Sequence, residues 1–381
     1  MNYRDELSKP RPGLKGGNAG RFLSDALGVD TPNLVRLLDI IWRDFDKERK
    51  GIGWWKSEGE GREDTQRRIL VADYLLGAAG AARKNLVETQ IHLGEWRYWL
   101  ARETEEMSAE SEFAPPRGWT LRGRPTLAAY FPSAMMDLHL AGFCRAVGSV
   151  LDVFGSVVVG VMPLPKNILK YSWTSLFADL DRTFDVAQME DLRKRAKIAV
   201  RAATEGEGAG WDQWVWWYRN TFVHRARRME FNTVDLVPGL FRPDRSRAYI
   251  FRPRLLLAID PDMSDVQAIA ANRTESVPTL TEDAEVTLPA VAARLQQLVD
   301  TVAAVLCEIW ILRRETPGLV PQPIRDQWPN PAGRSGVFVG FRPGDRVVRP
   351  GELRTNPDVI RRMIFAGLGD DERPTLWAPL E

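Results

Sequence analysis

A short stretch near the middle of the chain, RNTFVH, carries an arginine, an asparagine and a histidine. Arg219 stands directly before Asn220, and His224 follows four residues later. A neutral histidine near its ordinary pKa can take a proton from a ribose 2′-hydroxyl or give one to a leaving 5′-oxygen, and an arginine can stabilise the charge of a phosphorane. These side chains offer the chemistry of a metal-free ribonuclease with Arg219, His224 and Asn220 as its catalytic residues.

The sequence predicts that a helix starting after Gly210 positions these three side chains. On such a helix Asn220 and His224 lie one turn apart on one face, so the amide can hydrogen-bond the imidazole or a ligand. Arg219 and His224 differ by about 140° around the helix and about 7.5 Å along it. Both therefore reach one phosphate only if the arginine bends around the helix or a second copy of the helix faces the first.

The opposite face of this predicted helix is apolar. Its spacing predicts a core stripe made of Trp211, Val215, Tyr218, Phe222 and Met229. The four tryptophans at positions 211, 214, 216 and 217 are expected to pack in the core rather than to stack on bases. Two interpretations stay open for Arg225, Arg227 and Arg228: binding to RNA phosphates, or a solvated face near a helix C-terminus.

A long helix is expected from Ser133 to Val161. Its apolar residues recur every three or four positions and predict a core stripe of Met136, Leu140, Phe143, Val147, Leu151, Phe154 and Val158. A polar stripe of Arg145, Ser149, Asp152 and Ser156 follows the same helix on another face. This helix therefore has one side for the core and one side for polar contacts.

The rest of the chain is predicted to be mainly helical, with further helices at about 32–50, 186–203 and 289–314, and with one long helix or two nearly continuous helices at about 65–107. The stretches AYIF and RLLLAI could form a short hairpin within an insertion at about 232–285. The tail after 317 reads as a mixed extension with a strand-turn-strand unit and a terminal helix. We therefore divide the chain into an N-terminal arm and helix (1–75), a helical domain (76–316) and a C-terminal extension (317–381).

Composition excludes several classes of protein. Lys plus Arg is 52 and Asp plus Glu is 51, so no overall field attracts nucleic acid or a membrane. The two cysteines, Cys144 and Cys307, stand in apolar helical patterns, which is typical of free thiols in a reducing compartment. The N-terminus has no signal-peptide pattern, and the most apolar run is too short and interrupted to favour a membrane span. We expect a cytoplasmic protein without cofactor, metal or membrane partner.

The stretch RNTFVH, with the preceding DLHLAGFCRAVGSVLDVFG, resembles the HEPN superfamily, whose members are helical bundles with an Arg-x4-6-His motif. The resemblance covers about residues 76–316 and implies a HEPN-like helical bundle with a small β or extended insertion. It also implies that Arg145 and Asp152 on the long helix lie against the motif helix and support the site.

The function that this resemblance implies is metal-independent endoribonuclease activity at a composite site of a homodimer. Many members of the superfamily act in toxin-antitoxin or antiviral-defence systems, so an antitoxin or regulatory protein is an expected partner beside RNA. Two alternatives remain: a non-catalytic HEPN-like module that binds RNA or a protein, and a structural scaffold in which RNTFVH is a coincidence.

Overall fold

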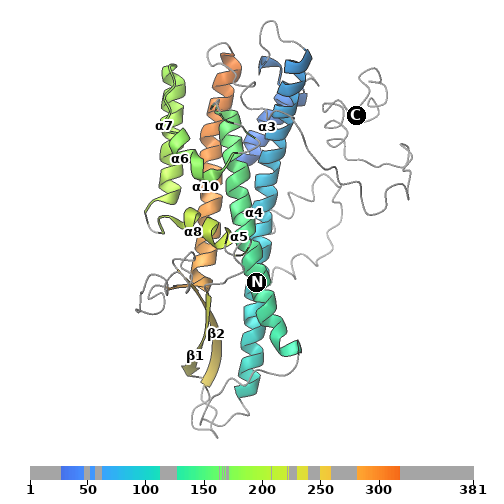
Figure 1. Ribbon diagram of the computed structural model, residues 1–381, viewed down its shortest axis with the longest axis vertical. Helices are drawn as coiled ribbons and strands as arrows, with labels where there is room; N and C mark the ends of the chain where they lie inside the picture. Colours follow the sequence, from blue (N-terminus) through green and yellow to red (C-terminus); the bar gives the residue numbers. More distant parts are fainter. Residues whose placement is uncertain are drawn as a thin grey trace, which may run out of the picture. The chain divides into compact units, whose positions relative to one another are not determined.

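The computed structural model describes residues 27–46, 52–55, 62–111, 127–162, 164, 166, 168, 171–206, 208–220, 222, 230–238, 249–258 and 281–317 (Figure 1). Most of these residues are helical, and the predicted class of mainly α protein is confirmed. The tail from 318 to 381, for which we predict a mixed extension, lies outside the described residues.

The first two long elements agree with their sequence patterns. Helix α3 runs from Pro32 to Asp46, with proline at the first helical position, where its missing N–H costs no hydrogen bond. Helix α4 is one continuous helix from Arg62 to Ser111. The short 3-10 helix η2, Gly53–Trp55, precedes it.

Helix α5 spans Leu127–Val161; it begins six residues before the predicted Ser133 and contains Pro132 in its interior. Every residue of the predicted core stripe is buried, from Met136 at 5% exposure to Val158 at 0%. The polar stripe is correct for the exposed Arg145 and the half-buried Asp152 but wrong for Ser156, which is buried. All residues from Phe154 to Val161 are buried, so this end of α5 has no solvent face.

Helix α7 covers Ala187–Thr204, within one residue of its prediction. After it, Gly206, Gly208 and Gly210 all have positive φ, which favours glycine and ends the helical path. Helix α8, Trp211–Asn220, then starts directly after Gly210 as expected. Helix α8 ends at Asn220, and residue 222 has π-helical conformation; the rest of its predicted continuation toward Met229 lies outside the described residues.

The observed strand pairing differs from the predicted hairpin. The stretches AYIF and RLLLAI do not pair with each other; they belong to one strand, β2, Tyr249–Ala258. Its partner is β1, Glu230–Pro238, which runs antiparallel to it, and β3, Thr281–Asp283, pairs with its far end. Pro253 fits inside β2 because β3 pairs only with Leu256–Ala258, so that within the described part of the chain the strand has a single neighbour at the proline.

Helix α10 spans Ala284–Glu315 and starts five residues before the predicted Pro289, which lies within its first turns. The described residues divide into two compact units. The first unit contains the described residues up to Leu34 with Ala81–Val153 and Arg195–Ala303, and the second contains Val35–Gly80, Phe154–Lys194 and the described residues from Ala304. The predicted division at 75 and 316 stays a prediction.

In the second unit a buried arginine closes the end of α5. Arg313 of α10 is 2% exposed and donates to the carbonyl oxygens of Gly160, at 3.1 Å, and of Val161. Its guanidinium lies 5.4 Å from the ring centre of Trp54 and 5.7 Å from that of Trp55. Arg313 thus binds two carbonyls that the helix end cannot satisfy itself, with two indole faces favouring its charge.

Two helical stretches are long and apolar enough to cross a membrane by length and composition, Phe131–Val161 and Ala284–Glu315. Within the structure 78% of the apolar window of the first and 56% of that of the second are buried by the protein itself. The core helix of a globular protein has the same properties, so the two stretches are weak evidence for a membrane protein.

Candidate functional site

The arginine of RNTFVH is held by an acidic residue of α5 in the first unit. Arg219 is in the last turn of α8, and its Nη1 donates to Oδ2 of Asp152 at 2.8 Å. The two side chains are 30% and 29% exposed. A charged bond at this distance fixes the direction of the guanidinium while leaving it accessible to a ligand.

A glycine of α5 makes room for this arginine. A Cβ atom added to Gly148 would lie 2.6 Å from Cδ of Arg219 and 3.3 Å from its Nε. Gly148 and Asp152 are one helical turn apart, so the arginine side chain crosses α5 at the glycine and ends at the carboxylate. Residues 148, 152 and 219 therefore form one built unit, which we call the arginine saddle.

The other predicted site residues are either on the surface of α5, at the end of α8, or outside the described residues. Arg145 is exposed on α5 two turns before Asp152, about 10.5 Å along the helix axis. Burial is the main reason why the pKa of His92 is lowered, and the charge of Arg145 lowers it further. Asn220 is half-buried at the end of α8. The predicted catalytic His224 and the predicted RNA-binding Arg225, Arg227 and Arg228 lie outside the described residues.

Two of the four tryptophans of α8 lie in the core, as the sequence predicts for all four, whereas Trp216 and Trp217 are half-buried. Trp211 and Trp214 are buried, and Nε1 of Trp211 donates to the carbonyl oxygen of Ala203 at 2.9 Å. The rings of Trp214 and Tyr218 lie 4.7 Å apart. These contacts anchor α8 in the first unit, and so they fix the position from which Arg219 reaches α5.

A second pair of chemically active side chains was not predicted. His92 of α4 and His139 of α5 face each other, with their Nδ1 atoms 3.0 Å apart. The Nε2 of His92 lies 3.7 Å from Oε1 of Glu88, one turn earlier on α4. Burial lowers the pKa of His92, and the charge of Glu88 opposes that effect. Nothing in the sequence links these histidines, which are 47 residues apart.

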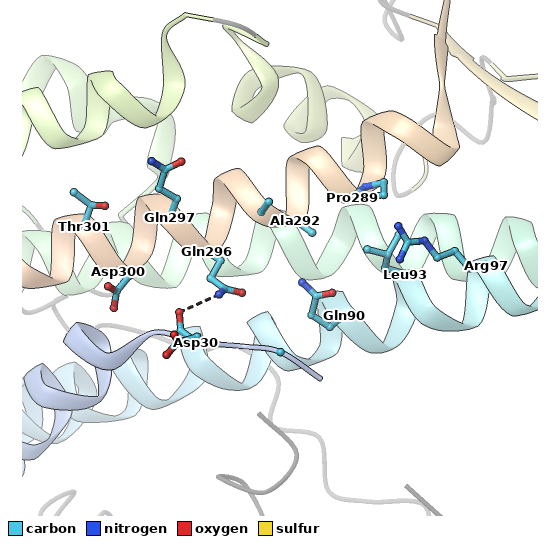
Figure 2. A pocket seen from close by; sticks show the side chains of 12 residues that line it. Asp30, Gln90, Leu93, Arg97, Pro289, Ala292, Gln296, Gln297, Asp300 and Thr301 are labelled. Atoms are coloured by element: carbon cyan, nitrogen blue, oxygen red, sulfur yellow. Dashed lines mark hydrogen bonds between the residues drawn. The ribbon is translucent and has the colours of Figure 1, made fainter. Parts of the chain in front are cut away.

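A polar groove of about 500 Å³ lies in the first unit, between α4, α10 and the residues before α3 (Figure 2). Gln90 and Arg97 contribute from α4. Nε2 of Gln296 donates to the carbonyl oxygen of Asp30 at 3.0 Å. Asp300 accepts two hydrogen bonds from Asn33, at 2.8 Å from the backbone and 2.7 Å from the side chain. Because two lining residues fasten the start of α3, we assign no ligand to this groove.

Among the described residues no group of three or more His, Cys, Asp and Glu side chains could hold a metal ion. Both cysteines, Cys144 and Cys307, are free and buried, as the sequence predicts.

No protein-family model, curated protein or solved structure matches the chain. The observations define a mainly helical protein. Its arginine saddle holds the guanidinium of Arg219 from α8 against α5.

Proposed function

We propose that the chain is a metal-independent endoribonuclease of the HEPN type, working as a cytoplasmic homodimer in a toxin-antitoxin or antiviral-defence setting. In this proposal Arg219 stabilises the transition state, His224 transfers protons and Asn220 orients the imidazole or the substrate. The observation that carries it is the arginine saddle, because Arg219 is fixed by Asp152 and Gly148 rather than left to rotate in solvent.

A fixed guanidinium suits phosphoryl chemistry. It has five N–H donors, so a bond from Nη1 to Asp152 leaves donors for a phosphate oxygen. A charge aimed in advance at the site where negative charge develops costs no reorganisation during the reaction. The exposure of 30% for Arg219 agrees with access for a substrate.

The proposed reaction needs only protein side chains and RNA. One His224 takes the proton of a ribose 2′-hydroxyl, whose oxygen attacks the adjacent phosphorus. The phosphorane that forms is stabilised by Arg219. The bond to the 5′-oxygen then breaks, and the His224 of a second copy supplies the proton for that oxygen. The products are a 2′,3′-cyclic phosphate and a 5′-hydroxyl.

A second candidate function has an observation of its own. Asp152 already neutralises Arg219, which suits a tie between α8 and α5 as well as it suits a catalytic group. The chain would then be a non-catalytic module that binds RNA or a protein partner. Stable RNA binding without cleavage supports this second candidate.

The experiment compares wild type, His224→Ala, Arg219→Ala and the control Arg201→Ala, which removes an exposed arginine of α7. Each protein is incubated with a mixed RNA pool in EDTA, and the fragment ends are identified. Cyclic-phosphate ends from wild type and Arg201→Ala, with intact RNA for the other two, are expected. Cleavage that survives in His224→Ala or requires magnesium contradicts the proposal.

A further inference from the structure

A groove lies between α7 and α10 within the second unit. Its volume is about 620 Å³, and its lining comes from residues 187–192 of α7 and 308–315 of α10. At the rise of an α-helix these segments are about 7.5 Å and about 10.5 Å long. The groove therefore offers a ligand about two helical turns of each helix.

Part of the lining is apolar surface that the protein does not cover. Leu192 of α7 is 8% exposed, whereas Ile311 and Leu312 of α10 are only half-buried. Removing such surface from water is favourable in proportion to the apolar area that is covered. A ligand of this groove is therefore expected to contribute apolar side chains.

Carboxylates lie beside this apolar surface, and no lysine or arginine is among the described residues that line the groove. Asp191 of α7 and Glu315 of α10 are exposed, and in the described part of the chain neither side chain takes part in a hydrogen bond or an ion pair. Glu308, the third carboxylate, already interacts within the chain. Asp191 and Glu315 are therefore the two groups with which a positive ligand can pair.

Three basic residues that neighbour these carboxylates in the sequence pair with other acids. Nη2 of Arg193 lies 2.7 Å from Oε1 of Glu190, and Nζ of Lys194 lies 3.6 Å from the same atom. Nη1 of Arg314 lies 3.4 Å from Oδ1 of Asp44. The groove thus keeps a negative potential, which repels RNA phosphates and attracts cations.

We propose that the groove binds a basic amphipathic helix of a partner protein. A helix that lies along two others buries apolar residues at positions i, i+3 or i+4, and i+7, a pattern that fits a groove of two turns. Leucines at these positions cover Ile311 and Leu312, and lysines on the two flanks pair with Asp191 and Glu315. This binding does not depend on RNA cleavage, so the ribonuclease proposal and the docking site can each fail without the other.

The test uses the full chain and a labelled synthetic helix of about 18 residues, five helical turns, with leucines on one face and lysines on both flanks. Fluorescence anisotropy should give a dissociation constant of about 1–100 µM, as for a small interface. Asp191→Lys and Glu315→Lys should each weaken binding at least about fivefold. The matched control is Glu105→Lys, because Glu105 of α4 is 67% exposed and does not line the groove; it should bind like wild type.

Two altered peptides separate the apolar contact from the charge contact. A peptide with serine in place of its leucines keeps the charge and should not bind. The double variant Asp191→Lys, Glu315→Lys should lose the lysine peptide and bind one in which glutamate replaces lysine.

No binding by wild type, equal binding of the serine peptide, or equal weakening in Glu105→Lys overturns the inference. Failure of the double variant to bind the glutamate peptide also overturns it when circular dichroism shows folded protein. The serine peptide is tested on wild type, so it decides the question even if a variant unfolds.

Discussion

His92 and His139 are joined by their Nδ1 atoms at 3.0 Å, although one belongs to α4 and the other to α5. In such a pair one ring must donate the proton and the other must accept it, so the two tautomers depend on each other. The ring of His92 also covers Gly142, where an added Cβ would lie 2.3 Å from its Cε1. The histidine contact and the glycine together fix how α4 packs on α5 in the first unit.

Gly142→Ala should destabilise the protein by about 1–3 kcal/mol, because the new methyl group displaces the His92 ring from a closely packed position. Gly80→Ala is the matched control: it changes another helical glycine that has no atom within 4 Å of the added Cβ. That control should stabilise by about 0.5–1 kcal/mol, the ordinary preference of a helix for alanine. Urea unfolding at pH 7.5 gives both values, and equal effects of the two substitutions would contradict the packing described for Gly142.

The stability of wild type should fall as the pH decreases below 6.5. Burial lowers the pKa of His92 beneath its ordinary 6.5; Arg145 lowers it as well, whereas Glu88 and Glu95 raise it. Above pH 6.5 the histidine is neutral in both the folded and the unfolded state. Below that pH the unfolded state binds the proton first, so the free energy of unfolding decreases until the folded pKa is reached.

The measurement is the melting temperature of wild type and His92→Gln at several pH values between about 7.5 and about 5, the range in which histidine titrates. The drop should be larger for wild type, because glutamine has no proton to gain. Carboxylates elsewhere affect both proteins alike, so parallel curves would remove His92 as the cause.

The core stripe of α5 is predictable from sequence, whereas its polar stripe is predictable only in part. The period of a helix is local, so Met136 and Val158 can be assigned to one face without knowing the fold. Whether the opposite face meets water depends on the elements around it, and Ser156 is buried where α5 is covered on all sides. Spacing identifies a face of a helix but not what lies against it.

Contacts between segments that are far apart in the sequence are also hard to predict from local patterns. The motif indicates Arg219, and Asp152 is expected against it only because of the resemblance; no local rule links Gly148 to the arginine. The pairing of the strands also depends on contacts that the local sequence does not show. In the sequence Pro253 separates two stretches that predict two short strands, yet it is tolerated within β2 at a point where, among the described residues, only β1 pairs with that strand.

The ion pair of Arg219 with Asp152 should contribute little to stability. Each side chain is about 30% exposed, and pairs of this kind contribute about 0–1 kcal/mol. A double-mutant cycle with Asp152→Asn and Arg219→Gln, followed by urea unfolding, should therefore give a coupling below about 1 kcal/mol. If Asp152→Asn nevertheless abolishes RNA cleavage, the carboxylate orients the arginine for chemistry. A coupling well above that value would favour the structural interpretation of the pair.

Two adjacent arginines of α10 should respond very differently to truncation. Arg313 is buried, and burial lowers its pKa to about 9, so it is still charged at neutral pH. Arg313→Ala leaves a cavity beside Trp54 and two unsatisfied carbonyls at the end of α5, and should cost about 3–5 kcal/mol.

Arg314 is 38% exposed, and its Nη1 lies 3.4 Å from Oδ1 of Asp44. Because this pair is partly solvated, Arg314→Ala should cost less than about 1 kcal/mol. Asp44 also accepts a hydrogen bond from Nε1 of Trp310 at 2.7 Å, which keeps the carboxylate in place after the substitution. Urea unfolding of the two variants decides the matter: similar losses for both would mean that Arg313 does not close the end of α5.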